Sequence, residues 1–100
     1  MSKTIMIGTK DVIVPDPFIV QEFGKWRLVA APSAETYAPD SFKREWVPKT
    51  IYSLTAERVE DHDAMGSPIY EDQEVNDDFL RVLFDYLMPE TKRPACEVVQ

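Results

Sequence analysis

The stretch from Asn76 to Pro89 carries the signals of both ends of a helix, and it constrains the fold more than any other part of the sequence. Asn76 is a favourable N-cap residue, and Asp77 and Asp78 follow it in the first turn, where the helix dipole favours negative charge. Pro89 ends the pattern, because the residue before a proline is driven out of the α region. The sequence therefore predicts a helix from about residue 77 to residue 88.

The predicted helix is apolar on more of its circumference than a surface helix needs. One stripe has the i, i+3, i+4, i+7, i+8 spacing of a core-facing side, and it comprises Phe79, Val82, Leu83, Tyr86 and Leu87. A second ridge, at i, i+4 and i+8, comprises Leu80, Phe84 and Met88. Either a sheet and a loop enclose both sides, or the second ridge is an exposed patch that binds a partner or another copy of the chain.

The first third of the chain has the pattern of short strands. Apolar, largely β-branched runs at 5–7, 12–14, 18–20 and 26–30 are separated by Gly, Pro and Asp. Gly24 supplies the positive φ that a tight hairpin turn needs. We expect an antiparallel meander here.

The middle of the chain is less regular. Residues 31–48 contain three prolines and predict a long connection, with a short helical turn at 41–46 capped by Asp40. Residues 50–59 alternate loosely and predict a strand, and a helix capped by Thr55 is the competing interpretation. Residues 60–74 predict a solvated acidic loop.

Together these elements predict an α+β fold in a single domain covering residues 1–100. An N-terminal antiparallel sheet of four or five short strands packs against the one C-terminal amphipathic helix at about 77–88. Residues 89–100 are expected to form a polar tail, with a short strand at 98–99 as one option. Cys96 lies in this tail, so we expect no role for it in the core.

The negative charge of the chain is concentrated in one stretch. The formal net charge is −7, yet residues 1–56 carry +1 and residues 79–100 carry none. Residues 57–78, which we call the acidic stretch, hold nine acidic residues against Arg58 alone, a net charge of −8. The nine are Glu57, Glu60, Asp61, Asp63, Glu71, Asp72, Glu74, Asp77 and Asp78. The stretch either solvates a loop or attracts a basic partner, and it argues against direct nucleic-acid binding.

No catalytic, metal or cofactor signature stands out. Asp61, Asp63, Gly66 and Asp72 fit positions 1, 3, 6 and 12 of a calcium loop, but Met65 at position 5 has no oxygen ligand. His62 is the only histidine and has no nucleophile placed beside it by a motif, so we expect an idle, exposed side chain. We therefore expect no metal, no cofactor and no enzymatic activity.

These observations predict a small interaction protein in the cytoplasm. We expect no membrane segment, since no apolar run is long enough to span a bilayer. The predicted role is an adaptor or an inhibitor, of the kind that phages and mobile elements encode, acting on a larger machine such as one that binds nucleic acid. Its contact surface would combine the acidic stretch with Leu80, Phe84 and Met88. The alternative is a structural subunit that self-assembles through the helix at 77–88.

Overall fold

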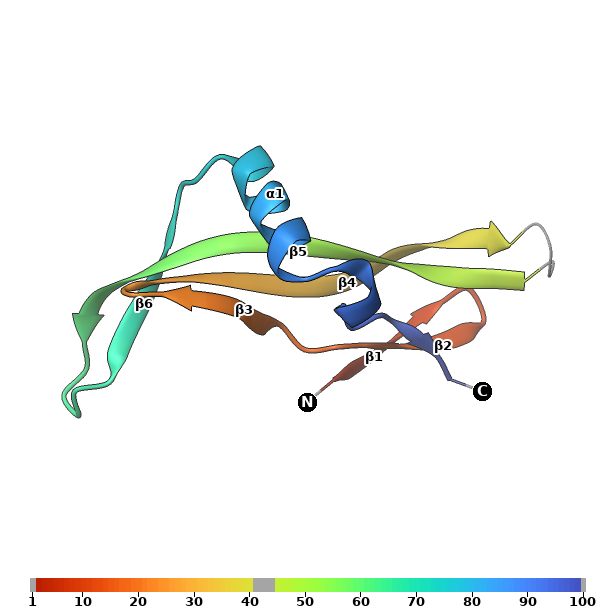
Figure 1. Cartoon of the computed structure of the whole chain (residues 1–100). Coiled ribbons are helices and arrows are strands. Elements are labelled where there is room, and N and C mark those ends of the chain that lie inside the picture. The colour runs from red at the N-terminus through yellow and green to blue at the C-terminus, as the bar shows by residue number, and fades with distance from the viewer. Residues whose placement is uncertain (1, 41–44, 100) are drawn as a thin grey trace. The chain divides into compact units, whose positions relative to one another are not determined.

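The computed structural model describes residues 2–40 and 45–99, and it has an α+β fold, as predicted. In chain order the elements are β1 (Lys3–Ile7), β2 (Lys10–Val14), β3 (Phe18–Phe23), β4 (Trp26–Asp40), β5 (Glu45–His62), β6 (Pro68–Gln73), α1 (Asp77–Leu87), the short 3₁₀ helix η1 (Glu90–Lys92) and β7 (Glu97–Val98) (Figure 1). The expected single N-terminal sheet is replaced by two antiparallel sheets. One has the order β1-β2-β7 and the other the order β3-β4-β5-β6.

The chain divides into two compact units. The first unit comprises Met1–Pro17, Ala31–Ser53 and Pro94–Gln100, and the second comprises Phe18–Ala30 and Leu54–Arg93. The long strands β4 and β5 each contribute residues to both units.

The core of the first unit contains Cys96, which corrects the expectation that it has no core role. Cys96 is buried together with Val12 and Val14, and half-buried apolar side chains from β1, β4 and β7 pack against this cluster. The Cys96 backbone N–H donates to Thr50 Oγ1 over 2.7 Å, and the Tyr52 hydroxyl donates to the carbonyl of Pro94. The C-terminal segment is therefore built into the first unit rather than forming a free polar tail.

The expected tail strand is present as β7, one residue earlier than predicted. Val98 and Glu97 pair with Val12 and Ile13 of β2. The backbone N–H of Val99 donates to the carbonyl of Asp11 over 2.9 Å. The pairing partner lies more than 80 residues away in sequence, so local chemistry alone does not specify this strand.

The predicted connection at 31–48 is largely strand, which is a second correction. β4 continues to Asp40 and β5 begins at Glu45, so Trp46 lies in a strand and not in a helical turn. Residues 41–44, where most of that turn was predicted, lie outside the described residues. Pairing between β3 and β4 ends at Phe18 and Ala30, so in the described part of the chain β4 has an open side beyond this point. The prolines of this region are compatible with strand, because proline lacks only the backbone N–H donor and an open strand edge does not require that donor.

The predicted acidic loop at 60–74 is a β-hairpin. The strand expected at 50–59 is confirmed and continues to His62, so the helix capped by Thr55 is wrong. After the turn, β6 pairs antiparallel with β5. One carboxylate oxygen of Asp63 accepts the backbone N–H groups of Met65 and Ser67, each over 2.9 Å, and Gly66 has φ +84°. The side chain of Asp63 thus closes the turn between the two strands.

Helix α1 has the predicted limits. The side-chain oxygen of Asn76 accepts the backbone N–H groups of Asp78, over 2.8 Å, and of Phe79, over 3.3 Å. The helix ends at Leu87 with Met88 as its C-cap, directly before Pro89. Local capping chemistry therefore accounts for both ends.

A candidate protein-binding surface beside helix α1

The side of helix α1 that faces the core is not the predicted one. Leu80 and Phe84, expected on the second and potentially exposed ridge, are buried, while Met88 is half-buried. Phe79, Val82 and Tyr86, expected in the core, are 59%, 69% and 83% exposed. At 100° per residue, the buried side is rotated by roughly a quarter of a turn from the predicted one.

Arg93 is one physical reason for this orientation. Its guanidinium lies over the ring of Phe84, with Cζ 4.5 Å from the ring centroid. Its Nε donates to the carbonyl of Met88 over 2.8 Å, and its Nη2 contacts Asp85 Oδ1 at 2.6 Å. The segment after Pro89 therefore contacts the side of the helix that bears Phe84.

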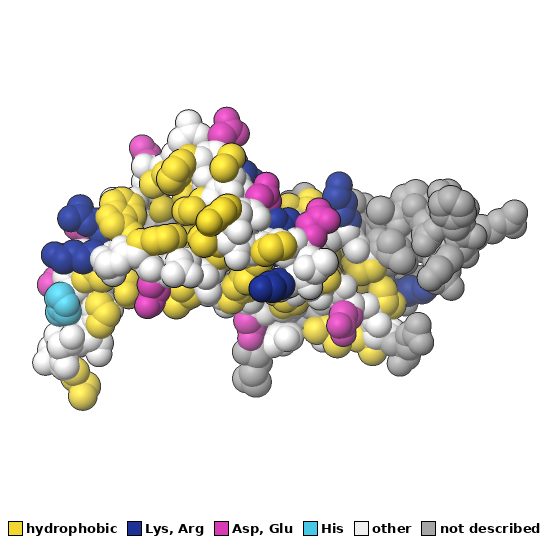
Figure 2. Space-filling model, in the orientation of Figure 1, with side chains coloured by type: hydrophobic (Ala, Val, Ile, Leu, Met, Phe, Trp, Pro, Cys, Tyr) yellow, Lys and Arg dark blue, Asp and Glu magenta, His cyan; other side chains and the backbone are white. Residues whose placement is uncertain are grey.

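A groove lies between α1 and the strands of the second unit. Its volume is about 410 Å³, and its lining is mostly apolar: Phe23, Trp26, Arg27, Leu28, Ala56, Val75, Phe79, Leu80 and Leu83. Apolar side chains gather over α1 and the strands next to it (Figure 2). Phe23, Trp26 and Phe79 are also among the exposed large apolar residues of the described chain. This groove was not predicted, because it combines residues from β3, β4, β5 and α1.

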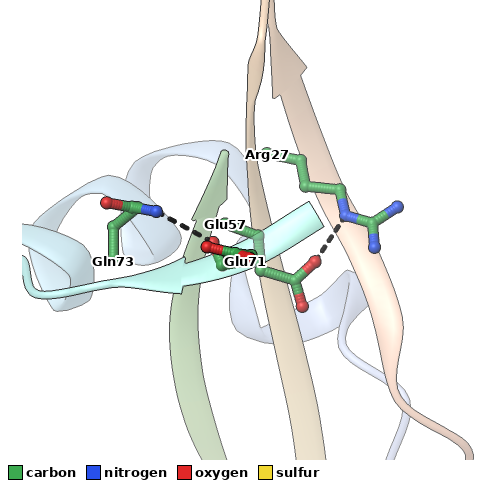
Figure 3. A network of polar contacts seen from close by, with 4 residues as sticks. All are labelled: Arg27, Glu57, Glu71 and Gln73. Carbon is green, nitrogen blue, oxygen red and sulfur yellow. Dashed lines mark hydrogen bonds and ion pairs between the residues drawn. The ribbon is translucent and has the colours of Figure 1, made fainter. Parts of the chain in front are cut away.

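A polar network links three strands at the groove. Arg27 of β4, a groove residue, contacts Glu57 of β5, with Nε 2.6 Å from Oε2 (Figure 3). The same guanidinium lies 3.6 Å from the centroid of the Tyr70 ring on β6. The side-chain amide of Gln73 donates to the backbone carbonyl of Glu71 over 3.2 Å and to Glu60 over 3.1 Å. Arg27 is thus neutralised by Glu57 and stacked on an aromatic ring.

The acidic stretch is spread over one hairpin and the start of α1. Glu57, Glu60 and Asp61 lie on β5, Asp63 lies in the turn, and Glu71 and Asp72 lie on β6. Glu74 precedes the helix, and Asp77 and Asp78 form its first turn. Glu57 pairs in register with Asp72, and Arg58 with Glu71. Of these nine acidic residues, only Glu57 and Asp77 form ion pairs among the described residues. A carboxylate oxygen of Asp77 lies 3.8 Å from Nε of Arg81.

The other candidate residues come together in no catalytic or metal-binding arrangement within the described ranges. His62 is exposed and lies opposite Pro68 in the hairpin register. No group of three or more His, Cys, Asp or Glu side chains in the part of the chain that the structure describes is arranged to hold a metal ion. The carboxylate of Asp63, the third position of the calcium-loop template, is engaged by backbone N–H groups of its own turn.

No family model matches the chain, and no curated protein and no solved structure matches it either. Within residues 2–40 and 45–99, no helix combines the length and the apolar character that crossing a membrane requires.

Proposed function

We propose that this protein is a non-enzymatic interaction module whose contact surface lies on the second unit. The surface combines the acidic stretch with the groove and with the exposed side chains of α1. The observation that carries the proposal is the exposure of Phe79, Val82 and Tyr86 on one helix that begins within the acidic stretch. Of the three apolar residues predicted for this surface, Leu80 and Phe84 are buried and Met88 is half-buried, so Phe79, Val82 and Tyr86 take their place.

The apolar part supplies affinity and the acidic part supplies selectivity. Burial of a large apolar side chain contributes roughly 1.5–3 kcal/mol before the costs of association. Uncompensated carboxylates such as Glu71 and Glu74 attract a basic surface and repel an acidic one, nucleic acid included. An adaptor or inhibitor of a larger cytoplasmic machine with a basic surface, such as a nucleic-acid-binding surface, fits this combination.

Site-specific crosslinking in cells that naturally express the chain tests the proposal. A photoreactive residue (Tyr86→benzoylphenylalanine) should capture a discrete protein partner, whereas the same group at Glu97 of β7 should not. Neutralising Glu71, Asp72 and Glu74 together (Glu71→Gln, Asp72→Asn, Glu74→Gln) should weaken the capture and leave the melting temperature nearly unchanged, since surface charges contribute little to stability. The matched control neutralises Glu90 and Glu97.

Either of two results would count against the module. One is the absence of any crosslink specific to position 86. The other is a crosslink whose yield is the same in the triple variant and in the control.

The exposed side of α1 also supports a second candidate, a subunit that self-assembles through this helix. Phe79, Val82 and Tyr86 lie at i, i+3 and i+7 and so share one side of α1. Sedimentation over a wide concentration range should then show an oligomer that Val82→Arg dissociates. A strict monomer at the highest concentration removes this candidate.

A further inference from the structure

The groove beside α1 has the size and composition of a site for a large apolar side chain. Its volume of about 410 Å³ lies within the range of protein ligand sites, roughly 300–1,000 Å³. Phe79 forms part of its wall from α1, and Phe23 forms part of its wall from β3. Both side chains are exposed, so an apolar group entering the groove would cover surface that now faces water.

The groove lies in the unit that carries the acidic stretch. Val75 lines the groove and is next in sequence to Glu74. Neither Glu74 nor Asp78 forms an ion pair within the described ranges. Arg27, the one base among the lining residues, is already paired with Glu57. Arg58 also lies near the groove, with Cζ 5.7 Å from the ring centroid of Trp26, but the second unit as a whole carries more acidic than basic residues.

The charge distinguishes between two possible occupants. A second copy of the chain would bring its own acidic stretch, net −8, toward an identical one, and opposing like charges weaken association. A segment that carries Lys or Arg beside an apolar anchor complements both parts of the surface. Peptides often bind to proteins through such anchors in a groove.

We infer that the groove binds a cationic segment of a partner protein, which inserts a large apolar side chain between α1 and β3 and places Lys or Arg beside the acidic residues of the second unit, Glu74 among them. This inference rests on the proposed function and specifies the chemistry of the partner. Phe79, which lines the groove from α1, is the central contact.

A labelled model peptide tests the inference. The probe is a fluorescein-labelled peptide of about 12 residues built from Lys, Leu and Trp, and fluorescence anisotropy reports its binding. Two matched peptides replace every Lys by Glu, or every Leu and Trp by Ser. Only the first peptide should bind, and raising NaCl from about 0.05 M to about 0.5 M should weaken its binding severalfold.

Matched variants locate the binding. Phe79→Ser should weaken binding about tenfold, as truncation of a central contact does, and Met6→Ser, at an exposed apolar residue of the first unit, should change it less than about twofold. Glu74→Gln with Asp78→Asn should weaken it about two- to tenfold, while Glu90→Gln with Glu97→Gln should have no effect. If circular dichroism shows that the Phe79→Ser variant is unfolded, Phe23→Ser on the opposite wall is used in its place. Equal binding of the Lys and Glu peptides, or equal effects at Phe79 and Met6, would overturn the inference.

The two proposals fail in different ways. If crosslinking at Tyr86 captures a partner but the peptide binds without charge preference, the interaction module stands and the cationic groove ligand is wrong. If the peptide binds as described but no partner is captured in cells, the groove chemistry stands and the proposed function is wrong.

Discussion

The guanidinium of Arg93 stacks over the ring of Phe84, and the same side chain donates to the carbonyl of Met88. Phe84 is nearly fully buried at 1% exposure, and the Arg93 side chain is 17% exposed. A residue beyond the end of α1 therefore covers a core residue within it. This contact helps decide which side of the helix faces the sheet.

Replacing Arg93 should destabilise the fold. Arg93→Met keeps the apolar stem and removes the cation and the donors, so the free energy of unfolding should fall by about 1–2 kcal/mol. Arg93→Lys should lose much of the same amount, because an ammonium lacks the planar guanidinium. Urea unfolding measures both. The control Lys92→Met, at the neighbouring exposed position in η1, should stay within about 0.5 kcal/mol; equal effects at residues 92 and 93 would contradict the stacking role.

The orientation of α1 predicts different outcomes on opposite sides of the helix. Leu80→Ala should lower the free energy of unfolding by about 2–5 kcal/mol, since it leaves a cavity in the core. Val82→Ala should change it by less than about 0.5 kcal/mol, because Val82 is exposed. Thermal or urea unfolding distinguishes the two. A larger loss at Val82 than at Leu80 would restore the orientation that the periodicity predicted.

Burial of Cys96 predicts a protected thiol. The native protein should react slowly with a thiol reagent such as dithionitrobenzoate, and the protein unfolded in guanidinium should react at the normal rate. Cys96→Ser places a hydroxyl beside Val12 and Val14 and should cost about 1–3 kcal/mol. Rapid labelling of the folded protein would show that the C-terminal segment is not packed as described.

The pair formed by Arg27 and Glu57 should be measurably coupled. Their side chains are only 25% and 18% exposed and approach to 2.6 Å, and Tyr70 stacks on the guanidinium. A double-mutant cycle with Arg27→Met and Glu57→Gln should give a coupling energy of about 1 kcal/mol, at the upper end for pairs near a surface. The same cycle on Arg81 and Asp77, exposed and 3.8 Å apart, is the comparison and should give about 0–0.3 kcal/mol. Equal coupling energies would mean that burial does not strengthen the first pair.

Local chemistry made several elements predictable. Asn76 and Pro89 specified the helix because capping and the loss of the α region before proline act within one turn. Gly24 marked the turn between β3 and β4, and it has φ +59° in the structure. The hairpin at 62–68 was missed, although Asp63 and Gly66 are typical turn residues, because its acidic composition was interpreted as solvation alone.

For residues 50–59 the sequence favoured a strand and left a helix capped by Thr55 open. It determined by itself where helix α1 begins and ends, and that the net negative charge is concentrated in residues 57–78. These depend on neighbours within a few positions. Only the tertiary structure decided which side of α1 is buried, because apolar residues occupy most of its circumference and the partner that covers Phe84 is Arg93, beyond Pro89. It also decided the place of Cys96 and the existence of the groove, since both require residues that are distant in sequence to meet in space.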